Sequence, residues 1–263
     1  MSGRRGRRSG GRLLRSVLYI LLLVAGGYAL VASGVMEAAL PERPAGKPPV
    51  EVKPKPPPLP SAALIDVPAQ SQLPALPNGC EVTSLSMLLT AVGHPVSYLT
   101  LAKDQPYDPT KRVLQDGKVV FWGNPNVGFV GSVYQAGLGY GIYHGPMTKF
   151  LNSILPGRAV DLTGKPFKDI ERVVADGTPV EMWTTTTLGP TTEWGSWQSP
   201  EGLVRFTPQE HAVLLVGYNR TDVFVNNPLN GEKAQATPIG PFLQSWNQLG
   251  DQAISVLPVK KKG

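Results

Sequence analysis

The chain has 263 residues, of which 41% are hydrophobic and 17% are charged, so it can build a sizeable core and is not a disordered polymer. Its 29 glycines and 27 prolines exclude a helical bundle, because both residues interrupt helix interiors. The single cysteine excludes an intramolecular disulfide framework, a cysteine-ligated zinc ribbon and an iron–sulfur cluster.

The net charge of +6 comes from the two ends of the chain. Six arginines lie within the first fifteen residues and three lysines among the last four, so the remainder is net negative. This distribution gives no support for nucleic-acid binding, and no nucleic-acid partner is expected.

A basic tail over residues 1–16 precedes an uncharged, apolar stretch over residues 17–36. Twenty helical residues span about 30 Å, the thickness of one hydrocarbon core. The positive-inside rule places the tail in the cytoplasm and the C-terminal part outside. A cleaved signal peptide is the alternative, because residues 32–34 are small, but the length of the apolar stretch favours a retained anchor. The first interpretation predicts a single-pass protein of the cell membrane, and the second a secreted one.

Residues 37–60 are rich in proline, with nine prolines between Pro41 and Pro60. Such a stretch forms no helix or central strand and predicts an extended polyproline-II stalk. The folded domain is then expected over residues 61–259, followed by a basic tail over 260–263.

The first elements expected in this domain are a short strand over Ile65–Val67 and, after a loop, a helix. Apolar residues at helical spacing predict a helix over Cys80–Val92, which ends at Gly93. Cys80 then lies in the first turn, where the helix dipole stabilises an anion and lowers a thiol pKa. The preceding Gly79 allows close backbone approach, as a reactive cysteine requires. The alternative is a buried structural cysteine.

Three histidines are available as a base for this thiol. His94 follows the helix, about 18–20 Å from Cys80 along the axis, and cannot reach it. His144 lies in a glycine-rich stretch and could line a cleft. His211 opens a continuous apolar run that predicts a buried strand, paired as a hairpin with the segment that follows.

The hairpin register points to a partner for His211. If Tyr218 faces Asp222, Asn227 is the diagonal neighbour of His211 and can accept a hydrogen bond from its Nδ1–H. A slip of one residue would present Asn226 instead. The alternative is a strand-end histidine followed by a turn asparagine.

The same residues suggest an oxyanion site. A nucleophile, a base and an orienting group in the order Cys80, His211 and Asn227 favour covalent catalysis. The backbone N–H of Cys80 is free at the helix start, and Gln72 could add a side-chain donor, with Gln70 as the alternative. Both glutamines could instead be solvated loop residues.

The middle of the domain contains no metal-ligand spacing and no phosphate loop, so no metal and no cofactor are expected. An aromatic and glycine-rich stretch over 121–143 could form a cleft wall or an ordinary loop. A helix is predicted over 165–175 and a strand over 179–184. A loop is predicted over 191–202, whose Trp194 and Trp197 could shape the site, and a final helix over 241–249.

Two stretches carry a resemblance to a known family: QSQLPALPNGCEVTSLSMLL and EHAVLLVGYNRTDVFVNNPLNG. They resemble papain-like cysteine peptidases, and most closely the bacteriocin-processing-peptidase-like domains of cysteine peptidase family thirty-nine. The resemblance implies an α+β fold in which a helix bearing Cys80 packs against an antiparallel sheet bearing His211. It also implies Cys80 as nucleophile, His211 as base and Gln72 as oxyanion donor.

The chain departs from the family pattern at two positions. The glutamine of the family usually stands six residues before the cysteine, where this chain has Pro74, so the loop after Gln72 must absorb two residues. The third member of the triad is often an aspartate, where this chain has Asn227; the papain branch uses asparagine.

The expected function is therefore that of an extracytoplasmic cysteine peptidase, which hydrolyses peptide bonds of a peptide or protein substrate through a thioester intermediate. Two alternatives stay open at this point. One is a catalytically inactive cell-surface module that binds peptide or wall polymer, and the other is a thiol-dependent acyltransferase.

Overall fold

The structure is a computed structural model that describes residues 57–257. The expected cytoplasmic tail, the apolar segment, most of the stalk and the last basic tail lie outside the described residues. Within residues 57–257, no helix combines the length and the apolar character that a membrane crossing needs. The end of the expected stalk lies against the domain, where Arg172 Nη1 donates to the Pro57 carbonyl at 3.2 Å and Tyr218 Oη donates to the Pro60 carbonyl at 3.1 Å.

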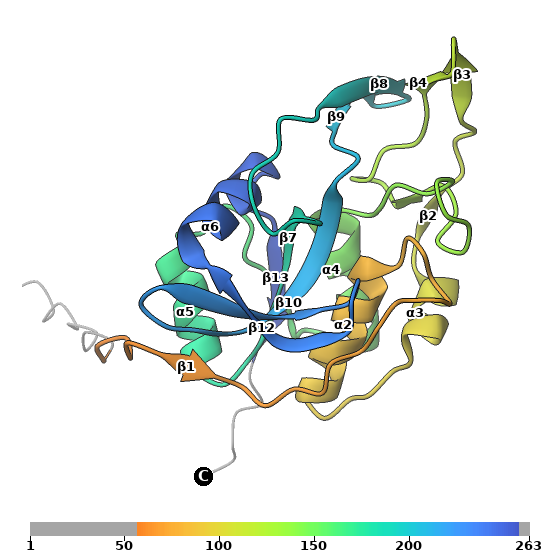
Figure 1. Ribbon diagram of the computed structural model, residues 1–263. Helices are drawn as coiled ribbons and strands as arrows, with labels where there is room; N and C mark the ends of the chain where they lie inside the picture. Colours follow the sequence, from red (N-terminus) through yellow and green to blue (C-terminus); the bar gives the residue numbers. More distant parts are fainter. Residues whose placement is uncertain (1–56, 258–263) are drawn as a thin grey trace, which may run out of the picture. The chain divides into compact units, whose positions relative to one another are not determined.

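An antiparallel sheet forms the centre of the fold (Figure 1). Its strand order is β12-β11-β10-β7-β13-β6, and β1 pairs with the end of β10. The long strand β10 is buried along its whole length, as expected for a strand that is covered on both faces. The strands are β1 (Ala63–Leu64), β6 (Ala159–Asp161), β7 (Val180–Thr185), β10 (Glu210–Tyr218), β11 (Asp222–Asn227), β12 (Glu232–Pro238) and β13 (Ala253–Val256).

Helices cover both faces of this sheet (Figure 1). On one face, α2 and α4 bury leucines and methionines against Trp183 and Leu214. On the other face, α5 buries Ile170 and Val174, and α6 buries Phe242 and Trp246, in a cluster with Met182 and Val213. The helices are α2 (Cys80–Ala91), α3 (Tyr98–Asp104), α4 (His144–Ile154), α5 (Phe167–Ala175) and α6 (Ile239–Gln248).

The predicted helices and the strand over 179–184 are confirmed within two residues at each end. The prediction of a short strand at Ile65–Val67 is wrong in position, because the strand that pairs with β10 is Ala63–Leu64. The loop expected over residues 191–202 is also wrong. It contains β8 (Gly195–Ser199), in which Trp197 is buried between the exposed Ser196 and Gln198, the alternation of a strand with one covered face.

This β8 strand belongs to a separate four-stranded sheet in the order β3-β4-β8-β9, which lies at the top of Figure 1. A two-stranded parallel pair, β2-β5, lies nearby. The remaining strands are β2 (Tyr107–Asp108), β3 (Val113–Gln115), β4 (Lys118–Phe121), β5 (Phe129–Val130) and β9 (Gly202–Phe206).

Helix α2 is buried from Cys80 to Leu89, which explains why its polar residues bond inward. Thr83 and Ser84 donate to the carbonyls of Gly79 and Ala212, at 2.7 and 3.3 Å. A Cβ atom at Gly79 would lie 2.5 Å from Leu76 Cβ, so only glycine permits this approach to the helix start.

The β10–β11 hairpin has the predicted register only away from its turn. Leu214 pairs with Asn226 as predicted, but Tyr218 pairs with Val223 instead of Asp222. A bulge between Leu215 and Gly217 accounts for the difference, because it adds one residue to β10. The end of the hairpin near His211 therefore keeps the predicted pairing.

Candidate active site

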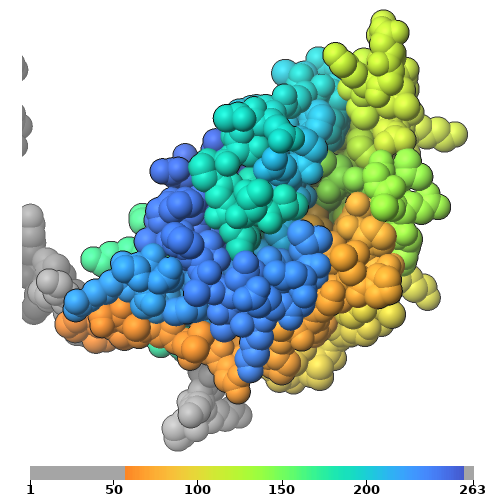
Figure 2. Space-filling view, viewed as in Figure 1, coloured from red at the N-terminus to blue at the C-terminus, as the bar shows by residue number. Residues whose placement is uncertain are grey.

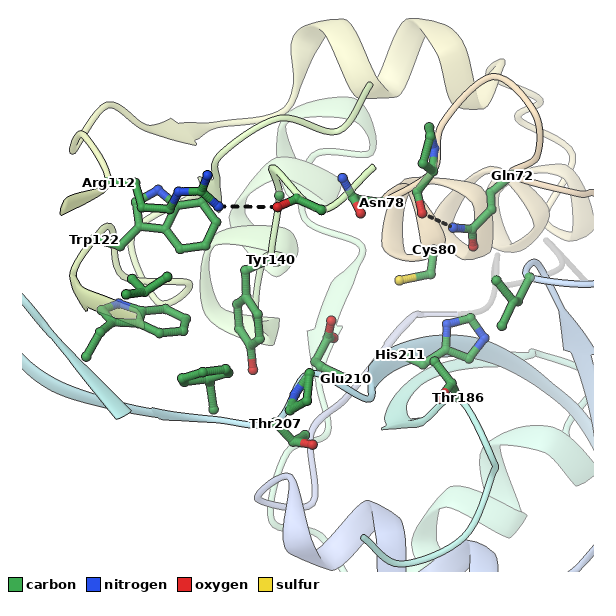
Figure 3. Close-up of a pocket in the computed structure, with 18 residues that line it drawn as sticks. Gln72, Asn78, Cys80, Arg112, Trp122, Tyr140, Thr186, Thr207, Glu210 and His211 are labelled. Carbon is green, nitrogen blue, oxygen red and sulfur yellow. Dashed lines mark hydrogen bonds between the residues drawn. The ribbon is translucent and has the colours of Figure 1, made fainter. Parts of the chain in front are cut away.

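The N-terminus of α2 and the start of β10 meet at one cavity of about 430 Å³. Cys80, His211 and Gln72 all line it (Figure 3). The space-filling view shows the segment around Cys80, in orange, next to the green and blue segments that form the rest of the rim (Figure 2). Residues that lie far apart in the sequence thus come together at the end of the central sheet.

Asn227 holds the His211 ring. His211 Nε2 lies 2.9 Å from Asn227 Oδ1, and the Leu229 N–H donates to the same oxygen at 3.1 Å. Because Oδ1 is an acceptor, His211 Nε2 carries the hydrogen and Nδ1 keeps a free lone pair. Asn227 Nδ2 in turn donates to Gln235 Oε1 at 2.9 Å. The contact between His211 and Asn227 was expected at Nδ1 of the ring, and this detail of the prediction is wrong, because Nε2 makes the contact.

Asn226 points to the other side of the strand, as alternation requires. It is fully buried, donates to the Val67 carbonyl at 3.0 Å and accepts from the Ala234 N–H at 2.9 Å. Both bonds tie the hairpin to neighbouring backbone and leave Asn226 without contact to His211.

The Cys80 thiol is turned toward a carboxyl group. Its Sγ donates to Glu81 Oε2 at 3.2 Å, and among the described residues no hydrogen bond joins Sγ to His211. In Figure 3 the sulfur is directed to the side of Glu210, away from the His211 ring. A rotation of the Cys80 side chain between staggered rotamers would exchange one neighbour for the other.

The protonation states in this cavity differ from the sequence-based prediction of a thiolate. Burial, followed by the charges of Glu81 and Glu210, raises the pKa of the Cys80 thiol well above its usual value. Burial lowers the pKa of His211 to about 4. A helix dipole contributes only about 0.3–1 kcal/mol, whereas full burial shifts a pKa by up to about 3–5 units. Burial therefore wins, and the resting pair is a neutral thiol and a neutral imidazole.

Two buried glutamates, Glu81 and Glu210, lie beside the thiol, and a third, Glu181, is buried in β7; none of the three was predicted from the sequence. Burial raises the pKa of Glu81 to about 7, and it also raises the pKa values of Glu181 and Glu210, which further rise because the carboxyls repel one another. A Cβ atom at Gly141 would meet Glu81 Oε1 at 2.5 Å and Glu210 Oε2 at 2.9 Å, so these two carboxyls lie side by side. Among the described residues none of the three forms an ion pair.

The sequence signal for this cluster is weak. Glu81 and Glu181 are the second residues of α2 and β7, and Glu210 is the first residue of β10, so each charged residue stands at the start of a buried element. Cys80 Sγ and carboxylate oxygens of Glu81 and Glu210 lie within 4.8 Å of one another, so these three side chains are of the kind that could hold a divalent cation. These three residues have no regular spacing in the sequence that would predict a cation site.

Two of the expected oxyanion donors lie beside the thiol. Cys80 is the first residue of α2, so its N–H has no partner within the helix. Gln72 is buried, lines the cavity and donates from Nε2 to the Pro77 carbonyl at 3.0 Å, which leaves its second amide hydrogen available. The alternative Gln70 does not line the cavity, and its backbone N–H donates to Met87 Sδ.

The other residues expected near the site divide into two groups. Trp122 and Tyr140 line the cavity, in line with the cleft wall considered for residues 121–143, and Trp197 lines it as considered for residues 191–202. Trp194 does not line it and lies under the Arg205 guanidinium instead. His144, the first residue of α4, does not line this cavity, so the idea that it lines the cleft is wrong here. Its Nδ1 lies 2.7 Å from Asp161 at the end of β6.

Comparison with known proteins gives the family of this chain. Residues 64–254 match the Peptidase_C39 like family, and the chain belongs to this family. A protein of Bacillus subtilis (strain 168) named "Uncharacterized protein YvpB" is 35% identical over 198 residues, which cover 74% of this chain and 76% of that protein. A crystal structure described as a C39-like peptidase from Bacillus anthracis is 38% identical, with a TM-score of 0.68 over 74% of this chain and 97% of that chain.

The α+β class of the prediction is thereby confirmed, with the helix that starts at Cys80 packed on an antiparallel sheet.

Glu81→Gln should make the Cys80 thiol easier to ionise. Rates of iodoacetamide alkylation against pH should give a midpoint above 8.5 for the wild type, because burial and the neighbouring carboxylates oppose the thiolate. Removal of the adjacent charge should lower this midpoint by more than about one pH unit. Glu201→Gln, at an exposed turn, is the matched control and should leave it unchanged. A wild-type midpoint below 8.5 would contradict the neutral resting pair.

Proposed function

We propose that the chain is an extracytoplasmic cysteine peptidase in which Cys80 is the nucleophile, His211 the general base and Asn227 the orienting residue. The observation that supports this most strongly is the shared cavity of Cys80 and His211, with the His211 ring fixed by Asn227. That bond leaves Nδ1 as the ring nitrogen that can accept a proton.

The reaction starts from the neutral pair. Once Cys80 has rotated toward the ring, Sγ attacks the substrate carbonyl carbon while His211 Nδ1 takes the thiol proton. The Cys80 N–H and the Gln72 amide stabilise the resulting oxyanion. Collapse breaks the C–N bond, the leaving amine takes the proton from His211, and a thioester remains on Sγ. Water then attacks the thioester, with His211 again as base, and the acid product leaves.

Asn227→Ala and Asn226→Ala should have opposite signatures. Loss of the ring partner should lower turnover of a fluorogenic peptide about 10-fold or more. Its effect on the melting temperature should be small, because the Leu229 N–H and Gln235, which also bond Asn227, are only half-buried. Loss of Asn226 should instead lower the free energy of unfolding by about 1–3 kcal/mol, because the buried Val67 carbonyl and the Ala234 N–H lose their partner. Turnover and thermal unfolding of both variants, with Cys80→Ala as background, check this.

The reverse pattern would contradict the assignment of Asn227. Equal turnover in Asn227→Ala and wild type, with no turnover in Cys80→Ala, would mean that His211 is oriented by another group.

The location outside the cell rests on residues 1–60, which are expected to form a basic tail, a membrane anchor and a stalk. Protease treatment of intact cells should release a soluble fragment of about 200 residues. A domain that stays protected until the cells are lysed would contradict this topology.

A second candidate function is supported by the orientation of the thiol. Cys80 Sγ contacts Glu81 and not His211, an arrangement that suits a catalytically silent module that binds peptide in the same cavity. Binding of peptide without turnover, together with the absence of an acyl group on Cys80 after mixing with a peptide ester, would favour this candidate.

A further inference from the structure

The cavity extends beyond Cys80 and His211 into a region walled by aromatic rings. Four rings line this region and belong to one apolar cluster: Trp122, Tyr140, Trp197 and Phe206. Ring centroids lie 5.1 Å apart for Tyr140 and Trp197 and 4.5 Å apart for Trp197 and Phe206. Trp197 Nε1 also donates to the Gly123 carbonyl at 2.8 Å. These contacts fix the walls, so this part of the cavity is preformed.

Glu210 lies at the end of this region that is nearer the thiol. Its side chain lines the cavity, and Figure 3 shows the carboxyl group between Tyr140 and Cys80. Glu210 is only 9% exposed, and its Oε1 is buried without a hydrogen-bond partner. The neighbouring carboxyl of Glu81 cannot neutralise it. An unpaired buried carboxyl is costly, and a cationic group brought by a ligand would supply the missing charge and donors.

Arg112 gives the other end of the cavity the opposite charge. Its guanidinium lies 5.3 Å from the centroid of the Trp122 ring, and Nη1 donates to the Gly137 carbonyl at 3.2 Å. In Figure 3 Arg112 and Glu210 lie on opposite sides of Tyr140. The cavity therefore has a guanidinium group at one end and a carboxyl group at the other end, beside the nucleophile.

We infer that this aromatic pocket is a specificity site for a substrate residue with a long cationic side chain, whose ammonium or guanidinium group binds Glu210. This inference rests on the proposed function and adds its substrate class. The methylene chain of such a residue would lie against the rings, and its charge would gain both the cation–π attraction of Tyr140 and a charge-assisted bond to the carboxylate. A neutral side chain of equal length gains only the apolar contact.

Paired peptides that differ at one position test the pocket. One peptide of each pair carries lysine at this position, and the other carries norleucine, which matches lysine in length without its charge. The position is moved along a fluorogenic peptide from pair to pair. All assays contain EDTA. The wild type should show at least a 10-fold higher kcat/KM for lysine at one position. Glu210→Gln should bring the ratio of lysine to norleucine close to 1. Arg112→Gln, which removes a repelling charge, should keep the ratio or raise it.

The ratio is the deciding quantity because Glu210 adjoins His211, so its substitution can also change the turnover of both peptides. Thermal unfolding of Glu210→Gln serves as the control for folding. Equal kcat/KM for lysine and norleucine at all positions in the wild type would overturn the inference and leave the proposed function standing. So would an unchanged ratio in Glu210→Gln.

If the wild type hydrolyses no peptide, the proposed function fails and binding decides the inference. Calorimetric titration of the Cys80→Ala protein with the same pairs should still show tighter binding of one lysine peptide, and the addition of Glu210→Gln should abolish that preference. Equal affinity for both members of every pair would overturn the inference.

Discussion

His211→Ala is expected to lower kcat/KM for a peptide substrate by about 10²–10⁴-fold, the usual contribution of a positioned general base. The reason is the neutral resting pair: the thiol is held protonated by burial and by Glu81, so attack requires a base that removes its proton. His211 Nδ1 is free to do so, because Nε2 is bonded to Asn227. Steady-state kinetics of the purified domain measure the effect.

The chain offers a matched control for this substitution. His144 does not line the cavity and interacts with Asp161, so His144→Ala should leave kcat/KM within about twofold of the wild type. Added imidazole should restore part of the activity of His211→Ala and none of the activity of Cys80→Ala. Wild-type kinetics in His211→Ala would show that another group, with Glu81 the nearest, accepts the thiol proton.

Glu181→Gln is expected to stabilise the protein increasingly as the pH rises. Glu181 is fully buried, neither carboxyl oxygen has a hydrogen-bond partner, and burial raises its pKa well above the usual range. The folded state therefore holds a proton that the unfolded state releases above about pH 4.3, so stability is lost as the pH rises above that value. Glutamine has the same shape and does not titrate.

Melting temperatures of both proteins at pH 5 and pH 8 measure this effect. The difference between Glu181→Gln and wild type should be larger at pH 8, by more than about 1.4 kcal/mol in free energy of unfolding, the equivalent of one pKa unit. His211 has a lowered pKa, so its contribution to stability increases with pH between about pH 4 and 6.5. This contribution is the same in both proteins and cancels when they are compared. Glu232→Gln, at an exposed position, should show no pH-dependent difference. A difference that is the same at both pH values would mean that Glu181 is not the source.

Local patterns were sufficient for the parts of the site that depend on one element or one hairpin. The spacing of apolar residues placed the start of α2 at Cys80. Alternation along β11 separated Asn227, which contacts His211, from Asn226, which does not. Even the bulge near Leu215 left this result unchanged, because the prediction was off by one residue only at the turn.

Other features depend on several distant segments and were missed. The protonation state of Cys80 was predicted from the helix dipole alone, but it is decided by burial and by carboxyls on α2 and β10. Strand β8 was interpreted as part of a loop over 191–202, because the glycines, serines and proline of this stretch are typical turn residues. Its strand character comes from pairing between Ser196 and Arg205, and between neighbouring residues, across the hairpin.

The nature of the intermediate is the most direct test of a peptidase that acts through Cys80. A peptide ester mixed with the enzyme and quenched in acid within milliseconds to seconds should give an intact mass that is higher by one acyl group. Proteolysis should locate that group on the peptide containing Cys80, and the adduct should decay to free acid at the rate of turnover in the wild type. Its absence while product still forms would contradict the account, as would an acyl group on any other residue.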